Sequence, residues 1–446
     1  MTEGVFRQTS YPKMRTGGQI RKSGMELATA VLLGLGNVPS FHPRGGLTLT
    51  HFIVLVGLPV FLPVAWRLRT ARWLFVLLLV WALGIVITSL ITGDRLFNVC
   101  LALSYPCTIA LSFFGAVWAF CQGSAVARTF VCSLITGLIA ANVLYKAPSY
   151  HVDPWKYALG PVITMCCILL AAALLSRGHF TVAVLVTSAI CLFNLLSGFR
   201  SLFLVTCVSF LVTVLTGLTG RPPGRRRWSR CVWVGIVLSC LLVALYSVYG
   251  QLASDGTLGR EQQIKWSRQA DSEGGAVIGA RPEIAGSLAL VAESPVIGRG
   301  VKPHVSAHSR SVFFRAWRAV NGGVEGPHER YYYFGKGLLI HSILFQRWLE
   351  TGILAVPGLV FPVGLLGAAV LTSISASSRS SILVFSFLLS LLLWDLLFSP
   401  WSRLHGVYFG TSAAAAAVYL KTRTNWWPIG TVGRRAVEED RLSRQR

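Results

Sequence analysis

The stretch WLFVLLLVWALGIVITSLIT, residues Trp73–Thr92, decides the fold of this chain, because it contains no charged residue. A helix needs about 20 apolar residues to cross the hydrocarbon core of a bilayer, and this stretch has that length. Similar apolar runs lie near residues 25–41, 47–66, 97–120, 129–145, 157–176, 180–197, 201–220, 231–250, 353–373, 382–398 and 405–420. They predict an all-α fold, a polytopic transmembrane helical bundle of about 12 spans. Gly34, Gly36 and Pro39 interrupt the first run, so about 11 spans are an alternative.

The composition agrees with a membrane protein. Hydrophobic residues make up 53% of the 446 residues and charged residues only 13%, which excludes an ordinary soluble globular domain. The formal net charge of +24 would indicate nucleic acid binding in a soluble protein. Here, however, the position of the Lys and Arg residues between the apolar runs explains most of the charge. We therefore expect no nucleic acid partner.

The basic residues also orient the chain. They concentrate in the two tails, at Arg67–Arg69 and at Arg221–Arg230, and an even number of spans places all of these on the cytoplasmic side. The predicted organisation is a cytoplasmic basic tail (1–24), spans one to nine (25–250), a large loop on the outer side of the membrane (251–352), spans ten to twelve (353–420) and a second cytoplasmic basic tail (421–446). No internal repeat is visible, which argues against a transporter built from inverted repeats.

The loop 251–352 is far longer than membrane insertion requires, so we expect it to serve a ligand or a reaction. Residues 255–280 are rich in Gly, Ser and charge, and predict an irregular crossing. An amphipathic helix of about three turns is predicted from Pro282 to Ser294, followed by a tight turn at Ile297–Gly300. A second helix is predicted over Leu338–Thr351.

Three residues are candidates for the chemistry, namely Arg200, Arg281 and His341. Arg200 lies in a short connection on the side that normally avoids positive charge, so it indicates an anionic partner or, alternatively, a lipid headgroup. Arg281 precedes a predicted helix N-terminus and suits a phosphate, with a solvated pair to Glu283 as the alternative. His341 would be a neutral proton acceptor or simply a packed residue. Glu350 falls near the opposite face of the predicted helix, so we expect no His341–Glu350 pair.

Further candidates are weaker. Arg299, in the tight turn, and Tyr332, whose ring suits a sugar or the membrane interface, are added as substrate-binding residues. His304 and His308 are four residues apart without an accompanying carboxylate pattern, and the ten cysteines include no CxxC pair. We therefore expect no metal site, no disulfide framework and no cofactor. Asp395, within an apolar run, is expected to form hydrogen bonds between helices.

His341-Ser342, nine further residues and Gly352 resemble the signature of the O-antigen ligase and Wzy-type polysaccharide polymerase superfamily. That signature is His, then Asn, Ser or Gln, nine residues, Gly, two residues, and Gly, Thr or Tyr; this chain has Ala355 at the last position. Leu196–Arg200 is similar to the family's small residues followed by Arg. Arg281–Gly300 is similar to its Arg-led helix that ends in Pro and Gly-x-Gly. The resemblance covers about residues 190–370.

The resemblance implies a metal-independent, inverting glycosyltransferase in the bacterial cytoplasmic (inner) membrane, with a periplasmic loop and cytoplasmic termini. The donor would be an undecaprenyl-pyrophosphate-linked glycan and the acceptor a saccharide. His341 would act as general base, while Arg200 and Arg281 would bind the pyrophosphate. The lipid bilayer and other polysaccharide assembly proteins are implied as partners.

Three functions stay open at this point. The favoured one is polymerisation of lipid-linked repeat units into exopolysaccharide or O-antigen. An O-antigen ligase, which moves the glycan to lipid A core or protein during lipopolysaccharide biosynthesis, would use the same donor. A non-enzymatic exporter or flippase of lipid-linked sugars would also have many spans and outward cations, but it would not need His341.

Overall fold

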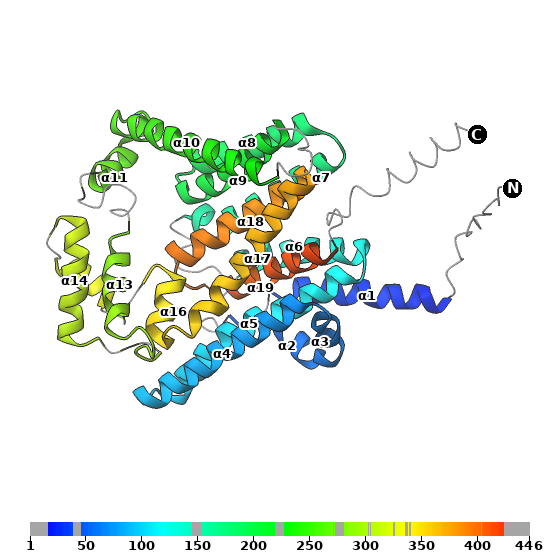
Figure 1. Cartoon of the computed structure of the whole chain (residues 1–446), viewed down its shortest axis with the longest axis horizontal. Coiled ribbons are helices and arrows are strands. Elements are labelled where there is room, and N and C mark those ends of the chain that lie inside the picture. The colour runs from blue at the N-terminus through cyan, green and yellow to red at the C-terminus, as the bar shows by residue number, and fades with distance from the viewer. Residues whose placement is uncertain are drawn as a thin grey trace.

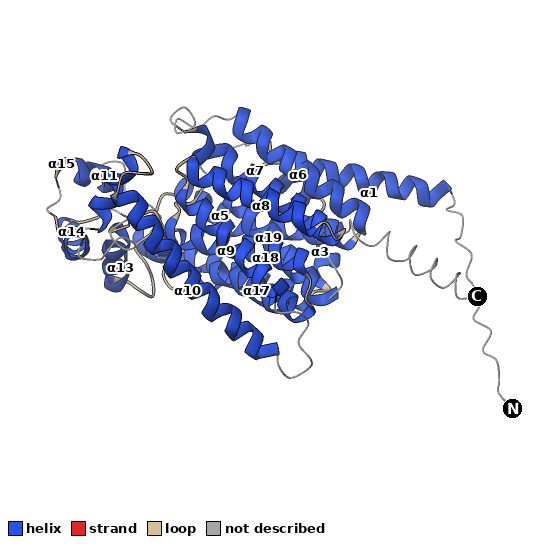
Figure 2. Cartoon of the chain, turned by 90° about the horizontal axis from the view of Figure 1, so that it is seen from above, coloured by secondary structure: helices blue, strands red, loops and turns tan. Residues whose placement is uncertain are grey.

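The computed structural model describes residues 17–38, 46–144, 153–218, 227–270, 272, 281–301, 303, 305–323, 326–334, 338, 340–402 and 404–422. Within these ranges the chain is helical and forms no β-strand (Figures 1 and 2). Parts of the predicted organisation lie outside the described residues: 1–16 and 423–446 of the basic tails, 219–226 of the basic turn, and His304.

The helices fall into two groups along the chain. Those of the main bundle are α1 (Gly17–Leu35), α2 (Leu49–Val56), α3 (Leu58–Trp66), α4 (Arg69–Thr92), α5 (Leu96–Cys121), α6 (Ser124–Leu144), η2 (Trp155–Leu159), α7 (Gly160–Ser176), α8 (Phe180–Leu196), α9 (Arg200–Leu218), α10 (Arg227–Ser254), α17 (Ala355–Ala376), α18 (Arg379–Phe398) and α19 (His405–Thr422). Between α10 and α17 come α11 (Arg260–Ala270), α13 (Glu283–Glu293), α14 (Ala307–Asn321), α15 (Pro327–Phe334) and α16 (Ile343–Thr351).

Seven described helices are long and apolar enough to cross a membrane, namely α4, α5, α6, α9, α10, α17 and α18. The number is eight if the bent pair α2 and α3 forms one span. Shorter apolar helices are formed by Ser23–Leu35 of α1 and by α7 and α8. The described residues are therefore those of a helical membrane protein. The full set of about 12 spans stays a prediction.

The predicted span 47–66 is not one continuous helix. Helices α2 and α3 meet at Gly57 with a bend of 82°. Pro59 follows in the first turn of α3, where a missing N–H is tolerated. Gly57 also leaves room for the ring of Phe61, which a Cβ atom would overlap. Apolar periodicity alone cannot show such a break, because both halves remain apolar.

Helices α17, α18 and α19 lie in the middle of the bundle (Figure 1). Helix α19 packs closely along α5 because its facing residues are small. A Cβ atom on Gly410 would lie 2.5 Å from the carbonyl oxygen of Ile109. Helix α10, by contrast, is the most exposed candidate span, with 6% of its apolar window buried against 39–67% for the other six. It lies along one side of the bundle (Figure 2), so most of its surface is left to lipid.

The helices between α10 and α17 gather at one end of the bundle (Figure 2). They have a small core of their own, formed by Leu290, Val291, Phe313, Phe314, Trp317, Tyr333, Ile340 and Leu349. Gly286 lets α13 approach α14, since a Cβ atom there would lie 2.5 Å from the ring of Phe313. Helix α13 has the predicted extent. The irregular crossing predicted for 255–280 is wrong in part, because residues Arg260–Ala270 form α11.

Candidate functional site

His341 stands immediately before helix α16 rather than within it, so the predicted helix over Leu338–Thr351 is too long at its start. Ser342 is the cause. Its backbone is extended, and its hydroxyl accepts a hydrogen bond from the Phe345 N–H at 3.3 Å, which caps the helix. The same hydroxyl donates to the carbonyl oxygen of Leu396 in α18 at 3.0 Å. Ser342 is fully buried, so it fixes the backbone beside His341 to a helix of the main bundle.

The far end of α16 is fixed by three glycines. Gly352 has φ +71° and Gly298 has φ +81°, and a Cβ atom on either would overlap the backbone of the other segment or come within 2.5 Å of it. The two segments exchange backbone hydrogen bonds: the N–H of Arg299 donates to the Leu349 carbonyl at 2.8 Å, and Ile353 N–H donates to Val296 at 3.2 Å. A Cβ atom on Gly300 would lie 2.7 Å from Oδ2 of Asp94, which follows α4. Both ends of α16 are thus held in place.

The imidazole of His341 contacts two other helices. Its Nε2 lies 3.2 Å from the hydroxyl of Tyr332 in α15, and the two rings are nearly parallel with centroids 5.9 Å apart. Its Nδ1 is buried without a hydrogen-bond partner among the described residues and lies 3.7 Å from Oε1 of Glu283, the first residue of α13. The imidazole therefore lies between a phenol and a carboxyl group.

Glu283 is shared by several neighbours. It is 4% exposed, Tyr333 Oη donates to its Oε2 at 3.5 Å, and Arg281 Nη1 lies 3.6 Å from its Oε1. Burial raises the pKa of the Glu283 carboxyl, while Arg281 and Tyr333 lower it. Burial and the adjacent Glu283 also raise the pKa of the Tyr333 hydroxyl, so Tyr333 stays a neutral donor. The side chain of Arg281 is 37% exposed, which leaves its guanidinium open to a ligand.

Burial, and then the positive charge of Arg281, lower the pKa of His341 to about 4. A contact of 3.7 Å between His341 and Glu283 would suggest an ion pair, but the low pKa means that the imidazole is neutral near pH 7. A neutral imidazole therefore faces the carboxyl group of Glu283. A proton on Nδ1 facing Glu283 leaves the lone pair on Nε2, the nitrogen that faces Tyr332.

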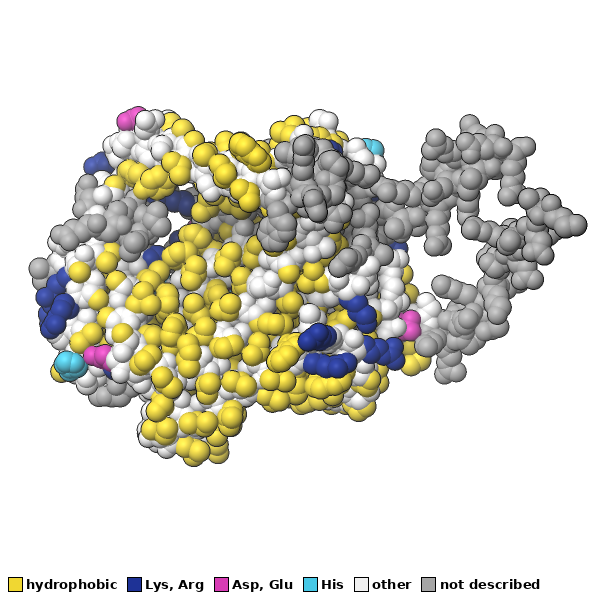
Figure 3. Space-filling view, viewed as in Figure 1, with side chains coloured by type: hydrophobic (Ala, Val, Ile, Leu, Met, Phe, Trp, Pro, Cys, Tyr) yellow, Lys and Arg dark blue, Asp and Glu magenta, His cyan; other side chains and the backbone are white. Residues whose placement is uncertain are grey.

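Arg200, at the start of α9, has partners from α10 and α11. Its Nε donates to Oε1 of Gln262 at 3.0 Å, its Nη2 contacts the same oxygen, and its guanidinium lies 5.3 Å from the ring centre of Tyr249. On the face drawn in Figure 3, a hollow lies between the region of α10 and α11 and that of α16 and α18, and Lys or Arg side chains stand at its edge. The surface there is suited to an anion.

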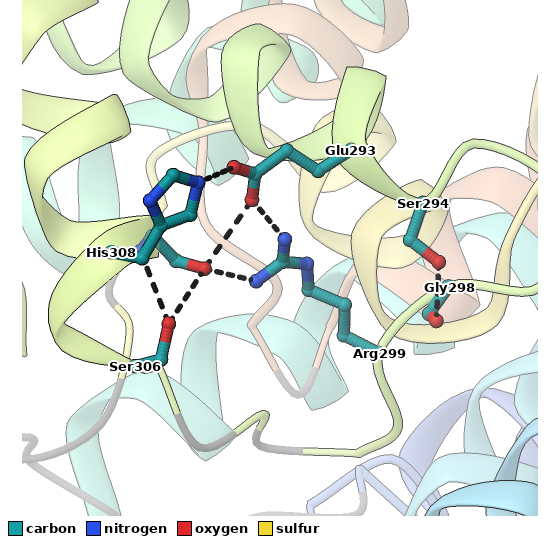
Figure 4. Close-up of polar contacts among 7 residues, drawn as sticks. Glu293, Ser294, Gly298, Arg299, Ser306 and His308 are labelled. Atoms are coloured by element: carbon teal, nitrogen blue, oxygen red, sulfur yellow. Dashed lines mark hydrogen bonds and ion pairs between the residues drawn. The ribbon is translucent and has the colours of Figure 1, made fainter.

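Arg299 links two loop helices (Figure 4), and its binding of substrate stays a prediction. Its guanidinium pairs with Glu293 of α13 and donates to the Ser309 hydroxyl of α14 at 2.7 Å. His308 Nε2 lies 3.4 Å from the other oxygen of Glu293. Ser306 caps α14 by accepting the Ser309 N–H at 3.1 Å. The positive charge of Arg299 is therefore balanced within the loop helices.

Arg347 and Glu350, three residues apart in α16, form an ion pair that is almost completely buried. The guanidinium of Arg347 also lies 3.7 Å from the ring centre of Tyr105 in α5, and Gln346 donates to Glu350 at 3.1 Å. These contacts join α16 to the main bundle. Asp395 has the helix-linking role expected of it, since one of its oxygens lies 3.4 Å from Nε2 of His405 at the start of α19.

The structure brings Arg281 and His341 together around Glu283, with Tyr332 on the other nitrogen of the imidazole. The sequence indicated Glu283 only as a neighbour of Arg281. The signal for its role is an acidic residue at the first position of the helix that Arg281 precedes. Among the residues that the structure describes, no group of three or more His, Cys, Asp or Glu residues is arranged to hold a metal ion. No protein-family model matches the chain, and comparison with curated proteins also gives no match.

Proposed function

We propose that this protein is a membrane glycosyltransferase that polymerises undecaprenyl-pyrophosphate-linked oligosaccharide repeat units into exopolysaccharide or O-antigen. The proposal places it in the bacterial inner membrane, with the helices between α10 and α17 in the periplasm and both termini in the cytoplasm. The observation that carries the proposal is the neutral, half-buried imidazole of His341 beside the partly exposed guanidinium of Arg281. The resemblance of His341–Gly352, Arg281–Gly300 and Leu196–Arg200 to the Wzy and O-antigen ligase signatures supports it.

In the proposed reaction a hydroxyl of the acceptor sugar attacks the anomeric carbon of the donor glycan. His341 Nε2 accepts the hydroxyl proton as the new glycosidic bond forms. The bond between the anomeric carbon and the pyrophosphate oxygen breaks, and undecaprenyl pyrophosphate leaves with the electron pair. Arg281 stabilises the negative charge that builds up on the leaving group. One displacement of this kind inverts the anomeric configuration.

Arg200 is proposed as a second pyrophosphate ligand. Its neighbours Gln262 and Tyr249 orient the guanidinium from α11 and α10. A pyrophosphate that reached both Arg200 and Arg281 would be bound by two guanidinium groups, each of which donates two parallel hydrogen bonds to phosphate oxygens. The exposed flank of α10 offers the lipid tail a route from the bilayer to this region. Tyr332 is proposed to lie beside the acceptor sugar.

The test uses purified protein in liposomes supplied with a lipid-linked repeat unit as both donor and acceptor. Longer lipid-linked chains are the expected product, and His341→Ala should abolish them. His179→Ala is the matched control. His179 is exposed and precedes α8, so it lies at the end of α8 opposite to the connection that leads to Arg200. Arg281→Lys should also impair the reaction, since a lysine cannot make the paired hydrogen bonds, whereas Arg128→Lys, an exposed change on α6, should not.

The products distinguish the three functions. Elongated lipid-linked glycan supports the polymerase. A ligase would be identified if the lipid-linked glycan stays unchanged by itself and is consumed only after lipid A core or a protein acceptor is added. Transport of the lipid-linked sugar across the liposome membrane, unaffected by His341→Ala, would contradict the proposed enzyme and identify an exporter.

A further inference from the structure

One oxygen atom of Glu283 serves two partners. Oε1 lies 3.6 Å from Nη1 of Arg281 and 3.7 Å from Nδ1 of His341. The carboxyl group is almost fully buried, whereas the Arg281 side chain is 37% exposed. A ligand can therefore reach the guanidinium, while water has little access to the carboxylate between them.

We propose, building on the proposed function, that Glu283 is a positioning residue through which pyrophosphate bound at Arg281 strengthens His341 as a base. Without an anion, Arg281 neutralises the field of Glu283 at the imidazole and adds its own positive charge. When a pyrophosphate pairs with Arg281, both effects are removed. Glu283 then acts fully on His341, so the base becomes stronger only when the donor is in place.

The direction of this effect follows from electrostatics. A cation close to a titrating group lowers its affinity for a proton, and an anion raises it. Because Glu283 and His341 are in contact and buried, their proton belongs to the pair, and neutralising Arg281 raises the proton affinity of the pair whichever member carries it. Interactions are also stronger here than at an exposed surface, since burial limits screening by water.

Other charged groups near His341 already have partners in the described structure. Arg347 and Glu350 of α16 pair with each other, and Asp395 of α18 pairs with His405. Tyr332 and Tyr333 of α15 contribute neutral hydroxyls. Arg281 and Glu283 are thus the charged groups whose balance at His341 a pyrophosphate would change.

The experiment is a ¹⁵N-histidine NMR titration of the full-length protein in detergent, in which the loss of one signal in His341→Gln identifies His341 among the nine histidines. We expect wild-type His341 to titrate with a midpoint of about 4. Undecaprenyl pyrophosphate should move the midpoint upward by about 1–3 pH units, and undecaprenol, which lacks the charge, should not. The ¹⁵N shifts also report which ring nitrogen carries the proton.

Substitutions of Arg281 and Glu283 test the two parts of this coupling separately. Arg281→Gln should raise the midpoint without any ligand, Arg281→Lys should keep it low, and Arg315→Gln, an exposed change on α14, should leave it unchanged. Glu283→Gln should reduce the response to undecaprenyl pyrophosphate to the part that comes from the charge of Arg281 alone. An unchanged midpoint in folded Arg281→Gln, or a full response in Glu283→Gln, would overturn the inference. A raised midpoint in Arg281→Gln with no response of the wild type to undecaprenyl pyrophosphate would instead support the coupling and contradict the proposed donor.

Discussion

Replacement of Gly352 by alanine tests how α16 is held. Gly352 follows the last turn of α16 with φ +71° and ψ −169°, a conformation that is essentially restricted to glycine. A Cβ atom there would overlap the carbonyl oxygen of Val296, which accepts a hydrogen bond from Ile353. The substitution therefore adds backbone strain and also forces apart two backbone segments.

The two contributions give the expected size of the effect. Backbone strain costs about 1–3 kcal/mol, and a collision in a packed region costs about 1–3 kcal/mol more, so Gly352→Ala should lose about 2–6 kcal/mol. Gly93→Ala is the matched control. Gly93 has φ +67° and ψ +35°, but nothing lies within 4 Å of a Cβ atom there, so only about 1–2 kcal/mol is lost.

The assay is thermal unfolding in detergent, followed with a thiol-reactive dye that reports the exposure of buried Cys191 and Cys207. At about 2 °C per kcal/mol, the lower end for larger domains, Gly93→Ala should lower the apparent Tm by about 2–4 °C and Gly352→Ala by about 4–12 °C. Both variants are compared at one heating rate, because such unfolding is often irreversible. Equal losses in the two variants would refute the steric argument.

Three more substitutions address the site and its support. Arg347→Met leaves the carboxylate of Glu350 buried and unpaired, so the stability of the protein should fall by about 3–5 kcal/mol. Adding Glu350→Gln should restore part of the apparent Tm. A double variant that unfolds at a still lower temperature would contradict the pairing. Ser342→Ala removes a helix cap and the hydrogen bond to α18. It should lower stability by about 1–2 kcal/mol and reduce kcat in the liposome assay. An unchanged kcat would show that the cap does not position His341. Tyr332→Phe removes the hydroxyl that occupies His341 Nε2, so the KM for the lipid-linked repeat unit, which is both donor and acceptor in the liposome assay, should fall by about 2- to 10-fold at similar kcat. A lost kcat would show instead that the hydroxyl takes part in the reaction.

The sequence predicted the helical membrane fold because long uncharged runs such as Trp73–Thr92 have few alternatives in water or lipid. It also predicted α13, since Pro282 and Ser294-Pro295 mark its ends and its apolar residues recur at helical spacing. Residue type and family resemblance indicate Arg281 and His341 as candidates for the same chemistry. Their proximity is a property of the folded chain, in which α13 and α15 meet the segment before α16.

Other features could not be predicted from local pattern. The apolar spacing of Leu338–Thr351 continues through Ser342, so periodicity gives a helix where a side-chain cap in fact starts one. The bend at Gly57 leaves the apolar run intact. The role of Glu283 depends on contacts with His341 and Tyr333, which lie far along the chain. Glu350 pairs with Arg347 and not with His341, but the spacing argument against a His341–Glu350 pair assumed one helix, which His341 in fact precedes. Spacing could not identify Glu283, the carboxyl group that lies beside His341.

The bond from Ser342 to the carbonyl of Leu396 ties the position of the His341 imidazole to the C-terminal end of α18, a candidate membrane span. A helix that is longer than the hydrocarbon layer responds by tilting. In bilayers of short-chain or long-chain lipids, the end of α18 would therefore rise or sink relative to the headgroups and carry His341 with it. Under the proposed function, the depth of the donor's pyrophosphate is set by the same headgroups, so acyl-chain length would change how closely the pyrophosphate and His341 approach each other.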